Sequence, residues 1–518
     1  MAGKTWLSFI KFMNKRNLKL GTRKSLLAWA QSSWVARALE KAHPGLTVEL
    51  VGIETQGDKI LDKPLSQIDG KEFFTAELDH ALIRGDVDLT VHSMKDLSLD
   101  RPPQMKLAAT PKRELQQDVV IFHETVMERL KKGEEIRVGT SSPRRLTLIP
   151  DFLRNALPRF SPTQSPRLRF VEIRGNVNTR LARIHEPESS DRKLDAVVLA
   201  FAGLERLAID EKGGLELAKL FQNTKTMILP LKECPSAPAQ GALAIEARSD
   251  RPEILSLIQA LHDPETLKTV AAERSVLKEW GGGCHQKLGA SAVDGDLYIK
   301  GEKPSGESVS QIRAYSSAPA GKSPSPEFTR IEAADVFRFE PKALSSEESA
   351  ILDHTDLAFV AHSRAFDFLG QKDRLSLKRV WVSGTKSWFK LALAGVWVEA
   401  SLEGKGLESL APFRAKKLLK IGDRPFALLT HAESRELTPP GPGIEPVATY
   451  RHEFQKIPQK ALDSDRLYWT SGLPFQAVWS RLNADQQKSF FKKTHACGPG
   501  KTAGVLKAHG IDPVLFRE

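Results

Sequence analysis

The sequence predicts an α/β protein with several domains. Its 518 residues correspond to about two to four domains of ordinary size. Hydrophobic residues make up 41% of the chain and charged residues 27%, which is usual for a globular protein. From Leu18 onward, short apolar stretches repeatedly end in glycine- or hydroxyl-rich turns that run into amphipathic helices. This alternation of strand, turn and helix is typical of open α/β sheets.

The N-terminus and the cysteines indicate a cytoplasmic protein. Residues 1–20 carry basic side chains around a short apolar patch, Trp6–Ile10, which is too brief for a signal peptide and lacks a small-residue cleavage site. No apolar run reaches the length of a membrane span, so we expect no membrane partner. The three cysteines, Cys234, Cys284 and Cys497, are odd in number and are not spaced as metal ligands. We therefore expect reduced thiols and no metal site.

The basic side chains indicate a small acidic ligand. The formal net charge is +12, which raises the question of nucleic-acid binding. However, the arginines stand singly or in pairs after turns and do not form a stripe along one element. Such a distribution favours pockets for carboxylates over a groove for a polymer, so we expect no nucleic-acid partner.

The first elements place basic residues at turns. Lys19–Ser25 opens a strand, a turn and a helix, with Arg23 in the turn and Ser25 as the N-cap. A strand over residues 46–55 and a helix beginning at Gly70 follow. Lys71 lies near the start of that helix, where a lysine opposes the helix dipole, and this makes a purely structural role less attractive.

The stretch Val91–Asp96 ends the next strand with a base and an acid side by side. Ligands bind at the carboxyl ends of strands in open α/β sheets, so Lys95 and Asp96 are candidates for one reacting centre. A lone Lys-Asp pair is more often a surface ion pair. The turns that follow along the chain favour the functional interpretation.

Residues 114–234 predict a second α/β unit with three basic turns. A strand at 136–139 is followed by hydroxyl-bearing residues and by Pro143 at the first position of a helix. A helix start of this kind holds carboxylates or phosphates. Any single arginine at such a turn is better explained as a solvated helix-start residue, but several at equivalent turns favour anion binding. The turns carry Thr140, Ser141, Ser142, Arg144 and Arg145; Arg174, Gly175 and Arg180; and Arg206.

Cys284 follows three glycines at the end of a helix predicted over residues 271–280. The glycines leave the thiol open to approach, which suits a nucleophile or an attachment point better than a small buried cysteine. Before that helix, residues 235–246 form a return linker and a strand, with Gln240 between them.

Together these motifs resemble one enzyme family, hydroxymethylbilane synthase, which is also called porphobilinogen deaminase. The resemblance covers about Leu18 to Ala314 and rests on the order and spacing of the motifs. The chain departs from the family pattern at Leu26, Ala76 and Lys287. The matching stretches are Gly21–Arg23, Gly70–Lys71, Val91–Asp96, Gly139–Ser142, Arg144–Arg145, Arg174–Val177, Ala202–Leu204, Gln240–Ala242 and Gly282–Cys284.

The resemblance implies a fold and a cofactor. It implies two periplasmic-binding-protein-like α/β domains, the first formed by residues 17–112 and 238–257 and the second by 113–237. A small α+β third domain, 258–320, would carry Cys284, to which one dipyrromethane cofactor is bound covalently by a thioether.

It also implies a reaction of porphyrin biosynthesis. Four porphobilinogens are condensed head to tail with loss of ammonia, and Asp96 stabilises the cation that forms. The family's cofactor-binding positions match Lys95, Thr140, Ser141, Ser142, Arg144, Arg145, Arg174 and Gly175. Its substrate-binding positions match Arg23, Ser25, Lys71, Arg180, Arg206 and Gln240.

The C-terminal third resembles uroporphyrinogen-III synthase, which cyclises the linear tetrapyrrole. After a linker, 321–345, a layout of strand, hydroxyl turn and helix occurs twice within residues 346–518. The resemblance covers 357–516 and implies a bilobed α/β module in which Thr470, Ser471 and Thr502 bind carboxylates. A degenerate module without this activity is the alternative.

A protein of another class remains open for the N-terminal part. The same two-domain fold serves non-catalytic solute receptors and transcriptional effector domains that bind small anions. Asp96 and Cys284 argue against such a receptor, because simple anion capture needs neither. We expect a monomeric enzyme whose partner is the small molecule porphobilinogen.

Overall fold

The computed structural model describes residues 17–55, 75–161, 163–283, 286–315, 327–437, 443–498 and 500–516. The chain divides into two compact units. The first contains residues 1–315 together with 392–403 and 411–422, and the second contains the rest of the C-terminal part. Among the described helices, none is both long enough and apolar enough to cross a membrane. Both units contain mixed α/β sheets, which confirms the predicted fold class.

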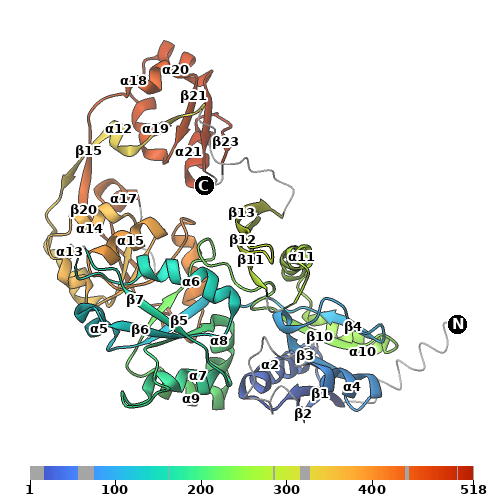
Figure 1. Ribbon diagram of the computed structural model, residues 1–518. Helices are drawn as coiled ribbons and strands as arrows, with labels where there is room; N and C mark the ends of the chain where they lie inside the picture. Colours follow the sequence, from blue (N-terminus) through green and yellow to red (C-terminus); the bar gives the residue numbers. More distant parts are fainter. Residues whose placement is uncertain are drawn as a thin grey trace. The chain divides into compact units, whose positions relative to one another are not determined.

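The first sheet of unit 1 has the strand order β2-β1-β3-β10-β4 (Figure 1). Strands β1, β2 and β3 are parallel, whereas β10 runs antiparallel between β3 and β4. The Ser25 hydroxyl accepts the Ala28 N–H at 3.3 Å, which confirms Ser25 as the N-cap of α2. The elements are β1 (Asn17–Arg23), α2 (Leu26–Ala42), β2 (Thr47–Ile53), α4 (Ala76–Arg84), β3 (Leu89–Ser93), η2 (Met94–Asp96), β4 (Met105–Ala109), β10 (Leu243–Arg248), α10 (Pro252–Ile258) and η4 (Gln259–Leu261).

The second sheet repeats this design with the order β7-β6-β8-β5-β9. Here β5 is the antiparallel strand, between β8 and β9. Ser142 caps α6 and Pro143 occupies its first turn, as the sequence predicts. The elements are β5 (Asp118–His123), α5 (Val126–Lys132), β6 (Glu135–Gly139), α6 (Pro143–Ala156), β7 (Arg167–Val171), α7 (Val177–Ala182), η3 (Arg183–His185), β8 (Ala196–Ala200), α8 (Phe201–Ile209), α9 (Glu211–Leu220) and β9 (Thr224–Ile228).

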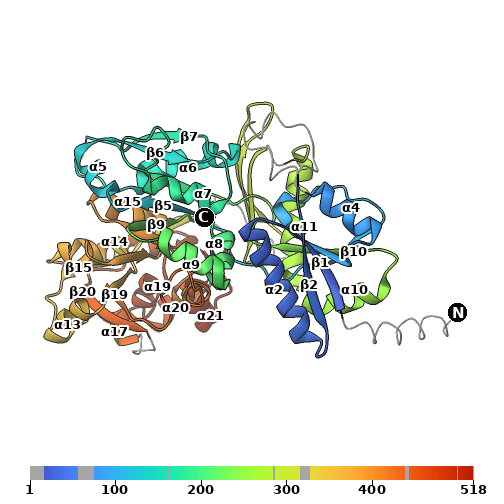
Figure 2. The same ribbon diagram turned by 90° about the horizontal axis from the view of Figure 1, so that it is seen from below.

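Two crossover segments join these sheets. Residues 110–117 lead from β4 to β5, and residues 229–242 return from β9 to β10. The Glu114 N–H donates to the Gly241 carbonyl at 3.1 Å, so the crossovers contact each other. Gly241 has φ +90°, and a Cβ there would lie 2.5 Å from the Glu114 carbonyl oxygen, which excludes a side chain at this position. In Figure 2 the sheet with β5, β6 and β7 is drawn apart from the sheet with β1, β2 and β10.

A helix and a small antiparallel sheet complete the N-terminal part of unit 1. Strands β11, β12 and β13 form a meander, and α11 contacts β11. Val276 and Trp280 pack against Leu288 and Ile299 in a core of their own. The elements are α11 (Pro264–Glu279), β11 (Lys287–Val293), β12 (Asp296–Glu302) and β13 (Ser308–Ala314).

Two later segments also belong to unit 1. In residues 392–403, the Trp397 indole N–H donates to the Thr226 carbonyl of β9 at 3.0 Å, and Glu399 accepts from the Thr226 hydroxyl at 2.9 Å. Residues 411–422 contact α8 and the first crossover through backbone and side-chain groups.

Unit 2 contains two sheets of mainly parallel strands. In the larger sheet β15, β20, β19, β16 and β17 follow one another, with β15 antiparallel to β20. The smaller sheet is parallel, with the order β14-β21-β22-β23. Trp469, Phe475 and Phe490 belong to the hydrophobic core of this sheet and its helices. The elements of residues 337–454 are β15 (Phe337–Pro341), α13 (Ser346–His354), β16 (Leu357–Val360), α14 (Ser363–Asp367), η5 (Lys372–Leu375), β17 (Arg379–Val382), α15 (Thr385–Leu393), β18 (Val398–Ser401), η6 (Leu407–Leu410), α16 (Ala411–Arg414), β19 (Phe426–His431), α17 (Ala432–Leu437) and β20 (Ile444–Phe454). Of these, β18 and α16 lie in the segments that belong to unit 1.

The region expected to be a linker, 321–345, differs from that expectation. It contains β14 (Thr329–Ile331), α12 (Ala333–Val336) and β15, and these strands pair with β21 and β20. The pairing partners lie more than a hundred residues away, so no local pattern reveals them. The remaining elements are α18 (Gln459–Asp463), β21 (Arg466–Trp469), α19 (Gly472–Trp479), α20 (Ala484–Phe491), β22 (Thr494–Cys497), α21 (Lys501–Ala508) and β23 (Val514–Leu515).

Candidate active site

Lys95 and Asp96 lie in the short helix η2 at the carboxyl end of β3. The Asp96 side chain is exposed, whereas Lys95 is half-buried, with its ammonium group 3.4 Å from Gln240 Oε1. Burial lowers the pKa of Lys95, and the nearby Asp96 carboxylate opposes this shift. The structure therefore joins three of the sequence-predicted residues at one strand end.

Arg274 of α11 holds the backbone of the same loop. Its guanidinium donates to the carbonyls of Met94 and Leu97 at 3.1 Å each and to that of Ser98 at 2.8 Å. The helix that carries Arg274 leads to the glycines before Cys284, and a Cβ on Gly282 would lie 3.4 Å from the Leu99 side chain. The loop bearing Asp96 thus contacts the helix and glycines that precede the cysteine. Cys284 itself lies outside the described residues.

Arg144 and Arg145 share one buried carboxylate. Arg144 Nη2 lies 2.7 Å from Asp118 Oδ2, and Arg145 Nη2 lies 2.8 Å from Asp118 Oδ1. The Gln240 amide also donates to Asp118 Oδ1 at 3.0 Å. The two guanidinium groups hold the pKa of Asp118 well below its usual range, although burial opposes this.

The α7 turn adds two more cations to this region. Asn176 caps the helix, and the Arg180 Nε–H donates to the Gly175 carbonyl at 2.7 Å. Burial lowers the pKa of Arg180 to about 10, with a further contribution from Arg145 and Arg174, and Asp96 opposes it. These interactions show that the side chains of α6, α7 and η2 share one electrostatic environment.

The predicted hydroxyl residues bond mainly to the local backbone. The Ser141 hydroxyl donates to the Ile173 carbonyl and accepts the Ile173 N–H. Ser142 accepts the Arg145 N–H at 3.5 Å, and buried Thr140 accepts the Ser142 N–H at 3.3 Å. These contacts shape the turn before α6 and explain why three hydroxyl residues occur together there.

Arg23, Arg206 and Lys71 complete the predicted set. Arg23 ends β1, and Arg206 of α8 donates to the Gly241 carbonyl at 2.6 Å. Burial lowers the pKa of Arg206 to about 10. Lys71 lies outside the described residues.

Sequence reasoning missed Asp118 and Arg274. Asp118 begins β5 directly before the apolar residues Val119–Phe122, and an acid at the head of a buried strand was an available signal. Arg274 lies in the interior of an ordinary amphipathic helix, where no sequence pattern distinguishes it.

The residues present fit an acidic cofactor. Five cationic side chains, from Lys95, Arg144, Arg145, Arg174 and Arg180, face two carboxylates, Asp96 and Asp118. The buried Nε atoms of Arg144 and Arg145 have no hydrogen-bond partner within the described ranges. A cluster with a surplus of positive charge and spare N–H donors suits a ligand that carries several carboxylates.

In unit 2, Thr470, Ser471 and Thr502 lie at one edge of the smaller sheet. Thr470 and Ser471 follow β21, and Thr502 lies in the first turn of the helix after the parallel neighbour β22. The Thr470 hydroxyl donates to the Ile331 carbonyl at 3.2 Å. A Cβ on Gly472 would lie 2.8 Å from Val505, which shows how closely the two helix starts approach.

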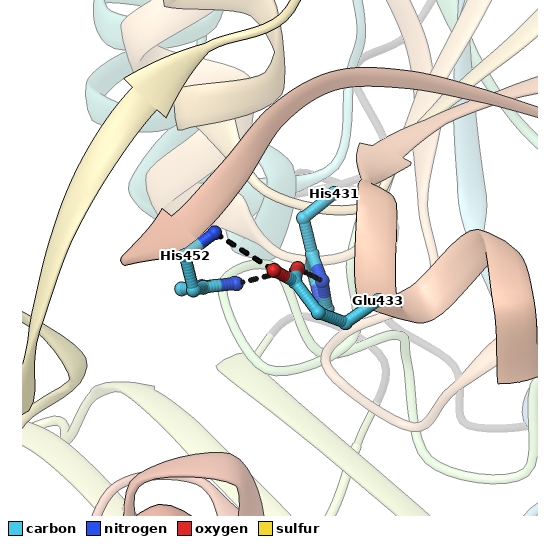
Figure 3. A group of neighbouring side chains, drawn as sticks. All are labelled: His431, Glu433 and His452. Carbon is cyan, nitrogen blue, oxygen red and sulfur yellow. Dashed lines mark hydrogen bonds and ion pairs between the residues drawn. The ribbon is translucent and has the colours of Figure 1, made fainter. Parts of the chain in front are cut away.

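A second polar cluster in unit 2 consists of His431, Glu433 and His452 (Figure 3). Glu433 Oε2 lies 2.9 Å from the Nδ1 atom of each histidine, and Oε1 accepts the His452 N–H at 2.9 Å. Histidine nitrogens and a carboxylate are ligand types that zinc binds. However, the Ser434 N–H also donates to His431 Nδ1 at 3.1 Å, so this ring nitrogen and the Glu433 carboxylate already have partners within the protein. The cluster joins α17 to β20.

The fold and the site define a class of protein, a mixed α/β protein with an exposed carboxylate among cations suited to an acidic ligand. Residues 18–256 match the family model described as "Porphobilinogen deaminase, dipyromethane cofactor binding domain". A porphobilinogen deaminase of Trichlorobacter lovleyi is 38% identical over 285 residues, which cover 55% of this chain and 81% of that protein. One of Geotalea uraniireducens is 38% identical over 310 residues, which cover 60% and 88%. The chain belongs to the porphobilinogen deaminase family.

Solved structures give weaker likenesses. A mutant uroporphyrinogen III synthase of Thermus thermophilus is 17% identical, with a TM-score of 0.26, and covers 35% of this chain and 81% of its own. YhfZ of Shigella flexneri is 15% identical, with a TM-score of 0.25, and covers 52% of this chain and 94% of its own.

Proposed function

We propose that this protein is a hydroxymethylbilane synthase that condenses four porphobilinogens with loss of ammonia into a linear tetrapyrrole. Membership of the family supports this activity. The observation that carries the proposal is the exposed Asp96 carboxylate, which interacts with the half-buried cations Lys95 and Arg180, and these in turn interact with the arginines of α6.

The proposal gives Asp96 and the cations separate roles. Loss of ammonia from porphobilinogen leaves a cationic pyrrole, and a carboxylate beside the ring nitrogens stabilises that charge and moves protons. Each ring carries an acetate and a propionate, for which the guanidinium groups of Arg145, Arg174 and Arg180 are suited. Dipyrromethane, attached to Cys284, supplies the pyrrole from which the chain grows.

We also propose the domain boundaries that the family resemblance implies. The first periplasmic-binding-protein-like domain takes residues 17–112 and 238–257, and the second takes 113–237. The crossovers at 110–117 and 229–242 support these limits because the chain changes sheet there. Residues 258–320 form the third domain.

For the C-terminal module we propose uroporphyrinogen-III synthase activity. Two observations support it: the chain forms two sheets with parallel strands and passes between them twice, and it brings Thr470, Ser471 and Thr502 to one sheet edge. Cyclising the linear product on the same chain would prevent spontaneous closure to the wrong isomer.

One experiment tests both activities. Full-length protein is supplied with porphobilinogen, and the cyclic product is identified by chromatography. We expect the type III isomer. Type I alone would show that the deaminase works and would refute the C-terminal activity, whereas no tetrapyrrole from cofactor-loaded protein would refute the deaminase activity.

Asp96→Ala should abolish turnover, with a loss of at least a thousandfold, and leave the cofactor attached. The loop backbone is held by Arg274, so removal of the exposed carboxylate should not disturb the fold. Turnover is measured by porphobilinogen consumption and cofactor attachment by intact mass. Asp100→Ala, which removes another exposed carboxylate from the same loop, is the matched control and should retain activity. Comparable activity in the two variants would refute the role of Asp96.

A further inference from the structure

Residues 411–422 lie far beyond the part of the chain that the family model matches, yet they belong to unit 1. They touch that unit at two acidic side chains, Glu205 of α8 and Glu114 of the first crossover.

Glu205 is a buried carboxylate that this segment satisfies. Only 2% of its surface is exposed, and its two oxygens accept the N–H groups of Lys417 and Leu418, each at 2.9 Å. Burial raises the pKa of Glu205, although these two hydrogen bonds oppose the shift. A buried carboxylate without such donors is strongly unfavourable, so the segment and Glu205 depend on each other.

Lys416 makes the second contact. Its ammonium group lies 2.5 Å from Glu114 Oε1, and both side chains are largely buried, with 18% and 15% exposed. Separating an ion pair that is shielded from water leaves two poorly solvated charges, so it costs more than separating a pair on the surface. Glu114 is the residue whose N–H bonds to Gly241 and so links the two crossovers.

The two contacts converge on the same point of the unit. Arg206, the neighbour of Glu205, donates to the Gly241 carbonyl that also accepts from Glu114. The segment therefore touches the helix that holds the second crossover and, through Lys416, the first crossover itself. Any movement of one sheet relative to the other bends both crossovers and must disturb this arrangement.

We propose that residues 411–422 form an intrachain hinge brace, which binds Glu205 and Glu114 and restrains movement between the two sheets of the deaminase. Its binding does not depend on the activity proposed above. Its effect on catalysis rests on that activity, because a cleft that holds a growing tetrapyrrole must change its opening at each addition.

Hydrogen exchange of the full-length protein tests the binding. The Lys417 and Leu418 amides should exchange slowly, and Glu205→Gln, which keeps the shape but replaces one acceptor with a donor, should speed them at least tenfold. Amides of β5 and β8 serve as the check that the fold is intact. Unprotected amides in the unaltered protein, or rates unchanged by Glu205→Gln, would overturn the proposal.

The restraint is tested with two neighbouring lysines. Lys416→Ala removes the ion pair, whereas Lys417→Ala removes an adjacent exposed charge and keeps the backbone N–H that Glu205 accepts. With limiting porphobilinogen, intact mass gives the fractions of enzyme carrying one to four added pyrroles. We expect Lys416→Ala to shift this distribution at least threefold and Lys417→Ala to leave it unchanged. If Lys416→Ala and the unaltered protein give the same distribution of added pyrroles, although the Lys417 and Leu418 amides are protected, the proposed restraint is refuted. If the unaltered protein adds no pyrroles, that result counts against the proposed function and not against the binding of residues 411–422.

Discussion

Asp118 in unit 1 and Glu433 in unit 2 are both carboxylates held between two nitrogen bases, but the bases differ. Asp118 is fully buried between two guanidinium groups, which are charged at every accessible pH. Glu433 is about one-third exposed between two imidazoles, and burial lowers the pKa of His431, so that ring is neutral near pH 7. The first cluster therefore carries a permanent positive surplus, whereas the second does not.

This difference separates an environment that is suited to an acidic ligand from one that is suited to a structural role. A permanent surplus of positive charge in a buried place is unfavourable unless an acidic ligand neutralises it. In the imidazole cluster the Glu433 carboxylate and the Nδ1 atoms of both histidines contact one another and so join α17 to β19 and β20. A carboxylate flanked by two bases is thus informative only once the charge state of the bases is known.

The largest expected effect belongs to Asp118→Ala, which leaves two buried guanidinium groups without their carboxylate. Breaking a buried ion pair in this way costs about 3–5 kcal/mol of unfolding free energy. Urea unfolding measures the loss, and Asp118→Asn should lose less because it keeps an acceptor. If Asp118→Ala is as stable as the unaltered protein, the buried arginines are compensated by other groups and the comparison fails.

The two clusters should respond to acid in different ranges. The pKa of Asp118 is lowered, so its stabilisation is complete above the ordinary aspartate value of 3.8 and is lost as the pH falls below it. Burial lowers the pKa of His431 from the ordinary histidine value of 6.5, so the stability that depends on its neutral ring is complete above 6.5 and declines as the pH falls below that value. Unfolding free energies from pH 7 to 5 should therefore fall less steeply in His431→Gln than in the unaltered protein. Asp118→Asn should match the unaltered slope in that range, and a changed slope there would contradict the assignment.

The smallest effect is expected for Glu433→Ala, about 1–2 kcal/mol, because Glu433 is one-third exposed and water can reach its His431 partner, whereas His452 is largely buried. The same urea titration measures it, with Glu340→Ala in neighbouring β15 as a control that should change little. Loss of deaminase turnover in Glu433→Ala would show that the cluster has a role beyond stability.

Local chemistry explains which features the sequence revealed. Ser25, Ser142 and Pro143 mark helix starts through contacts within a few residues, and the structure confirms them. The turns bearing Arg144, Arg145, Arg174 and Arg180 were also visible, because each follows its own strand.

Features that depend on distant pairing were not visible. Asp118 is paired with arginines more than twenty-five residues away, and Arg274 bonds to a loop about 180 residues away. In the expected linker, β14 pairs with β21 and β15 pairs with β20, and these partners are distant in the sequence. Periodicity and turn signals describe neighbours along the chain, so contacts of this kind remain outside their reach.

The segment 392–403 beside β9 has a practical consequence for anyone who expresses the N-terminal part of the chain alone. Strand β9 ends its sheet, so a protein cut after Tyr315 would expose a row of unpaired backbone groups and the side of Phe122 that Trp397 now covers. Uncovered strand edges recruit other chains and lead to aggregation. Poor yield of such a fragment would therefore reflect the uncovered strand edge rather than the absence of activity, and the 518-residue chain is the better material for activity measurements.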